Sequence, residues 1–119
     1  MKKVYSFTNS NFYRELQKCE KIEKEKAFCI KLMANSIFPE AENETILVQG
    51  IIDLFAIKND EIILVDYKTD FVEKENDLKI KYKKQLELYK KALEEAFNKK
   101  VKKVYIYSTY LEKEIECDL

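Results

Sequence analysis

The 119-residue sequence contains no histidine and no tryptophan, with Gly50 as its only glycine and Pro39 as its only proline. The lack of histidine disfavours zinc and copper sites, which commonly use imidazole ligands. A single glycine excludes the glycine-rich loops that cradle nucleotide phosphates, so no Walker-type ATP motor is encoded here. The scarcity of glycine and proline also favours regular elements joined by tight connections.

Cysteine and long apolar runs are also scarce. Cys19, Cys29 and Cys117 are odd in number and widely spaced, so they indicate neither a disulfide framework nor a four-ligand zinc or iron-sulfur site. We expect reduced thiols in a reducing cytosol. The basic start, residues 1–3, precedes no long apolar run, so we expect no secretion signal, no membrane span and a cytoplasmic chain.

Apolar residues make up 46% of the chain, enough for one folded core, and we expect a single domain over residues 1–119. The hydrophobic periodicity predicts the order α-β-β-β-α-β, with one or two strands after the second helix, and hence an α/β fold. The predicted elements are a helix from residue 11 to about 21, strands at 27–33, 46–57 and 61–69, a helix at 80–98, a strand at 101–109 and an edge strand at 112–117.

The hairpin at 46–69 brings chemically active residues together. If Asn59-Asp60 is a two-residue turn, Asp53 lies opposite Asp66, and Lys68 shares their face because side chains alternate along a strand. Two neighbouring carboxylates repel, and a divalent cation would remove that repulsion. Oxygen ligands without histidine favour Mg²⁺ or Mn²⁺, which suit reactions on phosphate esters. The alternative is a strand-end salt bridge between Asp53 and Lys68 without metal.

Charge is unevenly distributed although its sum is zero. Residues 40–73 carry nine acidic residues and two lysines, whereas residues 79–103 carry ten lysines and three glutamates. A basic segment beside an acidic, metal-binding hairpin would suit a hydrolase of nucleic acids. The alternative is a solvated helix face. Of two Asp-x-Lys triplets, we expect Asp66-Tyr67-Lys68 to end a strand and Asp77-Leu78-Lys79 to lie in solvent between strand and helix.

Three motifs in order resemble those of one family. Gly50-Ile51-Ile52-Asp53, Val65-Asp66-Tyr67-Lys68-Thr69 and Gln85-Leu86-Glu87-Leu88-Tyr89 are similar to the G-x-x-D, D-Y-K-T and Q-x-x-x-Y motifs of RecB-type nucleases of the PD-(D/E)XK superfamily. The residues of the third motif also resemble those of the AddA-type subgroup, in which the nuclease domain lies at the end of a helicase-nuclease chain. The resemblance runs from about Ile22 onward and implies a restriction-endonuclease-like core, with a mixed sheet of four to five strands flanked by helices.

The resemblance also implies roles for individual residues. Asp53 and Asp66 would bind the metal together with the Tyr67 carbonyl, and Lys68 would be the catalytic lysine. Gln85 and Tyr89 would shape the site and contact DNA, although their spacing alone favours ordinary helix residues, one solvated and one half buried.

The resemblance extends to a further site residue on the first strand. Glu25, in Glu25-Lys26-Ala27-Phe28, matches a Glu-Lys-Pro-Phe stretch on the family's first strand, with alanine in place of the proline. Many relatives place a histidine ligand on the first helix. Here Glu15 or Glu20 would substitute for it, or that position is unused.

The resemblance predicts a Mg²⁺- or Mn²⁺-dependent DNA exonuclease or endonuclease domain that hydrolyses phosphodiester bonds in recombinational DNA repair. It would be the C-terminal part of a larger helicase-nuclease, with DNA, a helicase motor and the partner nuclease subunit of an AddAB-type complex as its partners. The alternative is a catalytically weak DNA-binding or assembly module that is active only within the full helicase complex. The Gln85-Tyr89 motif disfavours a third possibility, a stand-alone resolvase-like or restriction-type enzyme.

Overall fold

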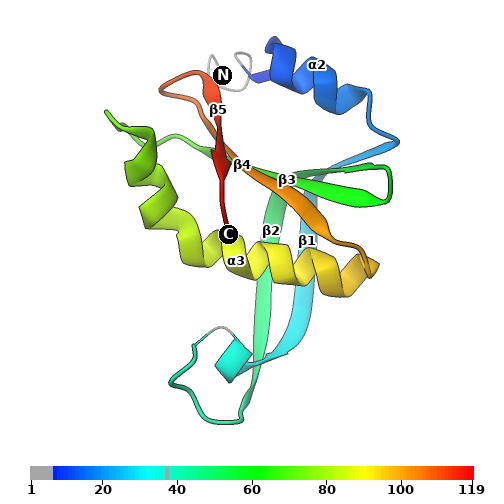
Figure 1. The fold of residues 1–119 in the computed structure, drawn as a ribbon, viewed down its shortest axis with the longest axis vertical. Helices are drawn as coiled ribbons and strands as arrows, with labels where there is room; N and C mark the ends of the chain where they lie inside the picture. Colours follow the sequence, from blue (N-terminus) through cyan, green and yellow to red (C-terminus); the bar gives the residue numbers. More distant parts are fainter. Residues whose placement is uncertain (1–6, 37) are drawn as a thin grey trace.

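The structure, a computed structural model, describes residues 7–36 and 38–119, so the basic start at residues 1–3 lies outside it. Its elements follow the predicted order, and the fold class is confirmed (Figure 1). They are α2 (Asn11–Gln17), β1 (Lys21–Met33), the short 3-10 helix η1 (Ala34–Ser36), β2 (Thr45–Lys58), β3 (Glu61–Lys68), α3 (Glu75–Phe97), β4 (Val101–Ser108) and β5 (Lys113–Cys117).

The strands form one mixed sheet in the order β1-β2-β3-β4-β5. β3 and β4 run parallel because α3 crosses over between them, while the other neighbouring pairs are antiparallel. Asn59 and Asp60 have φ angles of 52° and 65°, and two positive values characterise the tight turn that suits a two-residue hairpin. The predicted turn is therefore confirmed.

The two helices lie on opposite faces of the sheet. On one face, Tyr13 and Leu16 of α2 pack in a cluster with Leu54, Val65 and Tyr107. On the other face, α3 packs in a second cluster, of which Leu64 and Leu86 are fully buried members. The hairpin strands are thus apolar on both sides where helices cover both, as their sequence predicted.

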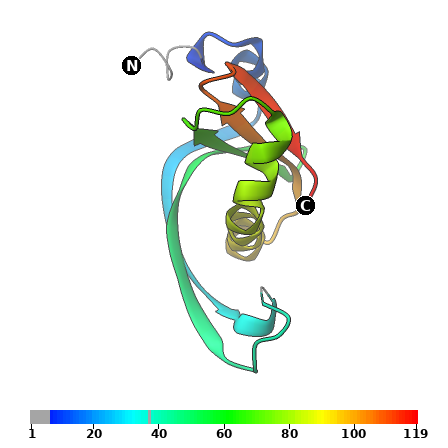
Figure 2. The same cartoon turned by 90° about the vertical axis from the view of Figure 1, so that its left-hand side faces the viewer.

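The first strand is longer than its sequence suggested. β1 begins at Lys21, six residues before the predicted start at residue 27, and pairs with β2 from Lys21–Ile57 to Met33–Thr45. Its charged first half is mostly exposed on an edge strand, so it carries no apolar pattern that would reveal it. The end of β1, residues 27–33, pairs with the start of β2, residues 45–51. These two segments form a curved arm that extends beyond the helices (Figure 2).

Both helix boundaries also differ from the prediction. α2 ends at Gln17, short of the expected residue 21, because the chain enters β1 there. α3 begins at Glu75, five residues before the expected start, with Glu75 and Asp77 in its first turn, where acidic side chains favour the helix dipole. The triplet Asp77-Leu78-Lys79 therefore lies within the helix and not in a connecting loop, and Leu78 is fully buried.

Cys19, Cys29 and Cys117 form no disulfide. In the part of the chain that the structure describes, no helix is long and apolar enough to cross a membrane.

Candidate active site

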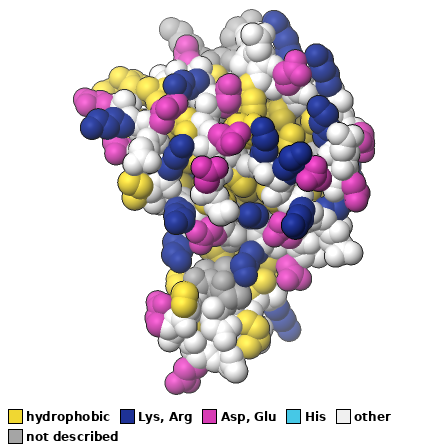
Figure 3. Space-filling model, in the orientation of Figure 1, with side chains coloured by type: hydrophobic (Ala, Val, Ile, Leu, Met, Phe, Trp, Pro, Cys, Tyr) yellow, Lys and Arg dark blue, Asp and Glu magenta, His cyan; other side chains and the backbone are white. Residues whose placement is uncertain are grey.

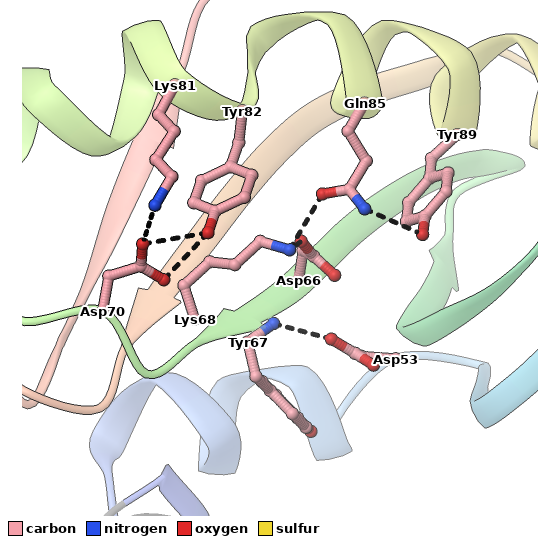
Figure 4. Close-up of polar contacts among 9 residues, drawn as sticks. All are labelled: Asp53, Asp66, Tyr67, Lys68, Asp70, Lys81, Tyr82, Gln85 and Tyr89. Carbon is pink, nitrogen blue, oxygen red and sulfur yellow. Dashed lines mark hydrogen bonds and ion pairs between the residues drawn. The ribbon is translucent and has the colours of Figure 1, made fainter.

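The two hairpin acids lie where the pairing of β2 with β3 ends. The last residue pair on that side is Leu54–Val65, and Asp53 and Asp66 occupy the next position. There the Tyr67 backbone N–H donates to Asp53 Oδ2 at 2.8 Å. The carboxylate of Asp53 thus takes a position that a strand carbonyl would normally fill, and the two acids lie across from one another at an opened strand end (Figure 4).

A local distortion of the arm accompanies this opening. Glu25, across from Asp53 on β1, has a φ of 51°, and neither residue takes part in the ladder pairs on either side of them. Ile52 and Phe55 belong to one core cluster, although strict alternation would place them on opposite faces. Holding a non-glycine residue at positive φ costs roughly 1–2 kcal/mol. The strained backbone of Glu25 therefore lies beside the point, at Asp53, where the alternation of side chains along β2 is interrupted.

Steric crowding explains why a glycine occupies position 50 in the first motif. A Cβ added there would lie 3.1 Å from Cε1 and Cζ of Phe28 and 3.4 Å from Cε1 of Tyr89. Phe28 and Tyr89 meet edge to face with ring centroids 5.4 Å apart. The glycine therefore lets the α3 residue Tyr89 approach the arm closely.

Asp66 is the buried acid of the site, with 3% of its surface exposed. Burial raises its pKa to about 7, and the nearby Asp53 carboxyl adds to the rise while Lys68 opposes it. Among residues 7–36 and 38–119, Asp66 Oδ2 is the one buried side-chain N or O atom without a hydrogen bond. Lys68 Nζ lies 2.8 Å from it as an ion pair, which gives charge compensation without hydrogen-bond alignment.

Lys68 is held from three sides. Besides Asp66, its ammonium donates to Gln85 Oε1 at 2.8 Å and lies 4.1 Å from the centroid of the Tyr82 ring (Figure 4). Its side chain is only 15% exposed. A lysine with three partners in a nearly closed setting has a fixed direction, so its charge is aimed at the strand end that carries Asp66.

Gln85 and Tyr89 face the same site from α3. Gln85 Nε2 donates to the Tyr89 hydroxyl at 3.2 Å, so the amide joins the lysine to the tyrosine. Burial raises the pKa of Tyr89, and the negative charge of Asp66 adds to this rise. The structure thus brings together Asp53, Asp66, Lys68, Gln85 and Tyr89, as the three motifs predicted.

Sequence reasoning missed a second set of polar residues beside the lysine. The Tyr82 hydroxyl donates to both carboxylate oxygens of Asp70 at 2.9 Å, and Lys81 Nζ donates to Asp70 Oδ2 at 2.5 Å. Tyr82 precedes Gln85 by three residues, which puts the two on one side of the helix. That spacing was the available signal, but the contact with Asp70 depends on the loop between β3 and α3.

The acids expected as possible further ligands fall into two groups. Exposed Glu15 pairs with Lys18 at 3.1 Å, and Glu20 Oε1 accepts from the Asn59 backbone N–H at the hairpin turn, so neither joins the site. Glu25 lies on β1 across from Asp53, where the ladder pairing is interrupted, and its side chain is exposed. Its role at the site stays a prediction.

The donor set fits a hard divalent cation. Asp53 and Asp66 supply carboxylates, and the Tyr67 carbonyl points to the β2 side because both backbone polar groups of a strand residue face the same neighbour. Because Asp66 Oδ2 accepts no hydrogen bond, it can still coordinate a cation. Among the described residues, no group of three or more His, Cys, Asp or Glu side chains is placed so that it could hold a metal ion, so the side-chain ligands would be the two aspartates. Mg²⁺ typically uses one or two carboxylates and keeps several waters.

The acidic and basic segments of the sequence meet in space. Lys81 pairs with Asp70, Lys99 with Asp60, and Lys102 with Glu61 at 3.5 Å. Basic and acidic side chains intermingle on the face shown in Figure 3. Part of the lysine-rich segment therefore neutralises the acidic hairpin, and the expected contact of the remaining lysines with DNA stays a prediction.

Comparison with known proteins identifies similar sequences. The sequence pattern of the PD-(D/E)XK nuclease superfamily matches residues 7–116. An ATP-dependent helicase/nuclease subunit from Clostridium botulinum (strain Alaska E43 / Type E3) is 45% identical over 121 aligned residues, which cover 95% of this chain and 10% of the relative. The protein of the same name from Thermoanaerobacter sp. (strain X514) is 42% identical, with 88% and 9% covered. This chain spans about a tenth of the length of these relatives.

Proposed function

The chain belongs to the PD-(D/E)XK nuclease superfamily, and from that membership we propose that it hydrolyses phosphodiester bonds of DNA with Mg²⁺ or Mn²⁺. The family and the AddA-type relatives agree with the resemblance that the three motifs predicted. The observation that carries the proposal is the buried Asp66 beside Asp53, with Lys68 fixed against it and one Asp66 oxygen left without a hydrogen bond.

Each residue has a distinct task in this proposal. Asp53, Asp66 and the Tyr67 carbonyl would hold the ion, which when bound would polarise a phosphoryl oxygen and lower the pKa of water. Lys68 would orient the attacking water and offset the negative charge that develops on the phosphate. Gln85 would keep the ammonium in place through its 2.8 Å hydrogen bond, and Tyr89 would hold the amide of Gln85.

Nuclease assays with a matched control test the proposal. We expect the purified chain to cut single- or double-stranded DNA with Mg²⁺ or Mn²⁺ and to lose this activity with EDTA. Lys68→Ala should abolish cutting, whereas Lys79→Ala, which alters the lysine of the other Asp-x-Lys triplet in α3, should cut like the parent. Equal activity of the parent and Lys68→Ala would show that a contaminating host nuclease does the cutting, and would overturn the assignment.

We also propose that the chain acts as the nuclease part of a longer helicase-nuclease that processes DNA ends in recombinational repair. The relatives are named as subunits of an ATP-dependent helicase/nuclease, and this chain matches about a tenth of each. It would work beside a helicase motor and a partner nuclease subunit. The test is whether the chain, supplied in place of the matching segment of such a relative, restores cutting that depends on ATP.

An assembly module that is active only within the full helicase complex is a second candidate. The arm favours it, because Leu47 and Ile51, four residues apart on β2, have 57% and 58% of their surfaces exposed. This candidate predicts Mn²⁺ binding with little cutting by the isolated chain, and rescue when motor and partner are supplied. Strong cutting by the isolated chain would exclude it.

A further inference from the structure

Two aromatic side chains form an exposed pair outside the core. The rings of Phe71 and Tyr110 lie with centroids 4.3 Å apart and planes inclined by 49°. Phe71 remains 73% exposed and Tyr110 47% exposed. Much of the surface of both residues therefore stays open to a further planar group.

Phe71 is attached to the support of the candidate catalytic lysine. It follows Asp70, whose carboxylate accepts hydrogen bonds of 2.9 Å from the Tyr82 hydroxyl. The Tyr82 ring in turn lies 4.1 Å from Lys68 Nζ (Figure 4). The position of the Phe71 backbone is thereby tied to the same contacts that fix the ammonium.

Tyr110 is attached to the same lysine from the β4 side. It follows Thr109, whose backbone N–H and hydroxyl donate to the Lys68 carbonyl at 3.0 and 3.2 Å. Two separate loops thus bring one aromatic ring each to the end of β3. Because both loops are anchored on Lys68 or on its support, the pair has a defined place relative to the site.

The chain itself limits how far the pair lies from the site. Phe71 follows Lys68 by three residues, and each residue spans at most about 3.6 Å, so their Cα atoms lie within about 11 Å. Successive stacked bases of one strand are about 3.4 Å apart. The pair is therefore within reach of the first few nucleotides beside a phosphate held at Lys68.

Two acidic residues near the pair are compensated, whereas Glu73 and Glu112, each two residues from one of the rings, carry no ion pair in the described part of the chain. Asp70 accepts from Lys81 at 2.5 Å, and Glu75, near the start of α3, is 2.6 Å from Lys113. Carboxylates paired in this way repel a passing phosphate backbone less than free ones would. Open aromatic faces beside such neighbours match the stacking surfaces of proteins that bind single strands.

We propose that Phe71 and Tyr110 form a stacking platform for a nucleobase of the DNA strand that is cut, near the scissile phosphate. This assignment rests on the proposed nuclease function, because a phosphate at Lys68 is what brings a base to the pair. The platform would hold any base, since every base presents a planar face, and would therefore add affinity without sequence selectivity.

Binding measurements without metal test the platform separately from catalysis. With a short fluorescent single strand in EDTA, we expect Phe71→Ala and Tyr110→Ala to weaken affinity by about 5- to 100-fold, the range for loss of one stacked base. Phe71→Trp should bind at least as well as the parent. Ile80→Ala, at an apolar α3 position that is 69% exposed, is the matched control and should bind like the parent. Unchanged affinity of both alanine variants would overturn the platform.

An abasic scan decides whether a base is the ligand. Removing one base near the labelled end should weaken binding by the parent at one or two positions, and the same removal should cost Phe71→Ala little. Equal losses in both proteins would overturn the proposal. So would concentration-dependent dimerisation of the parent that Phe71→Ala abolishes, since it would assign the rings to a protein contact. A chain that stacks the base but fails to cut DNA would keep the platform and overturn only the nuclease function.

Discussion

At the scale of single residues, folding changes the ionisation of Asp66 strongly. Its pKa rises from an ordinary value of 3.8 to about 7, chiefly because burial disfavours the charged carboxylate. Between these two values the folded chain binds a proton that the unfolded chain has released. The contribution of Asp66 to the free energy of unfolding is therefore largest below the unfolded pKa and falls as the pH rises towards 7.

We therefore predict a pH-dependent difference between the parent and Asp66→Asn in EDTA. The free energy of unfolding of the variant minus that of the parent should rise from about pH 4 to about pH 7 and level off above, because asparagine does not titrate. Denaturant titrations at a series of pH values measure this difference. A difference that stays flat across this window, or falls, would contradict the buried setting of the carboxyl.

The aromatic support of Lys68 yields a second prediction. If a cation occupies the carboxylates, Lys68 loses part of its attraction to Asp66 and depends more on Gln85 and on the Tyr82 ring, 4.1 Å from its ammonium. Tyr82→Leu should then lower kcat by about 10- to 100-fold with little change in KM, because the ammonium is misplaced. Tyr82→Phe keeps the ring and should retain most of the rate.

Steady-state kinetics on one DNA substrate measure this split between kcat and KM. Lys81→Ala is the control, because it removes the other partner of Asp70 at an exposed position and leaves the ring in place. A Tyr82→Leu enzyme with parental kcat would show that the ring is only part of the core packing.

At the scale of elements, the joint between the arm and α3 depends on the single glycine. Gly50→Ala would place a methyl group 3.1 Å from the Phe28 ring and 3.4 Å from Tyr89. We expect a loss of about 1 kcal/mol of stability from this overpacking, whereas alanine would ordinarily improve a strand position. Adding Phe28→Leu should recover part of the loss. Urea unfolding measures both variants, and a stabilised Gly50→Ala would contradict the tight contact.

The sequence predicted the elements whose local signals agree with their tertiary setting. The hairpin combined apolar strands with Asn59-Asp60, two residues that tolerate positive φ. The first half of β1 gave no such signal, because its charged residues pair with β2 only through the backbone on an exposed edge. The start of α3 was missed because its first five residues are polar apart from Leu78.

The site was predictable to a similar degree. Register and motif spacing alone were enough to predict that Asp53, Asp66 and Lys68 lie together. The contacts of Tyr82 with Lys68 and Asp70 join a strand end, a loop and a helix, and their geometry depends on tertiary packing. The positive φ of Glu25 was equally hidden, since no local signal there calls for glycine.

At the scale of the whole molecule, the separation of charge along the chain is partly cancelled by folding. Segments of opposite net charge are joined by ion pairs such as Lys81–Asp70 and Lys102–Glu61. Such surface pairs contribute little stability, so they do not hold the fold together. At the strand end, the two carboxylates of Asp53 and Asp66 face the single ammonium of Lys68, and this excess of acid favours capture of a small cation there.

Cation binding at that point should stabilise the whole chain. A ligand that binds only the folded state adds about 2.7 kcal/mol at a concentration one hundred times its Kd, so Mn²⁺ should raise the thermal midpoint. Because the ion must displace the proton of Asp66, whose pKa is about 7, the rise should be larger at pH 8 than at pH 6. Differential scanning calorimetry with and without Mn²⁺ measures both effects.

Three aspartate variants locate the effect. Asp53→Asn and Asp66→Asn should lose most of the rise, while Asp60→Asn, at the exposed hairpin turn, should keep it. If Asp53→Asn and Asp66→Asn respond to Mn²⁺ like the parent, the ion binds elsewhere and the metal site is wrong. If the rise is as large at pH 6 as at pH 8, the ion does not compete with the proton of Asp66. Its ligands would then be Asp53 and other oxygens, with Asp66 remaining the partner of Lys68.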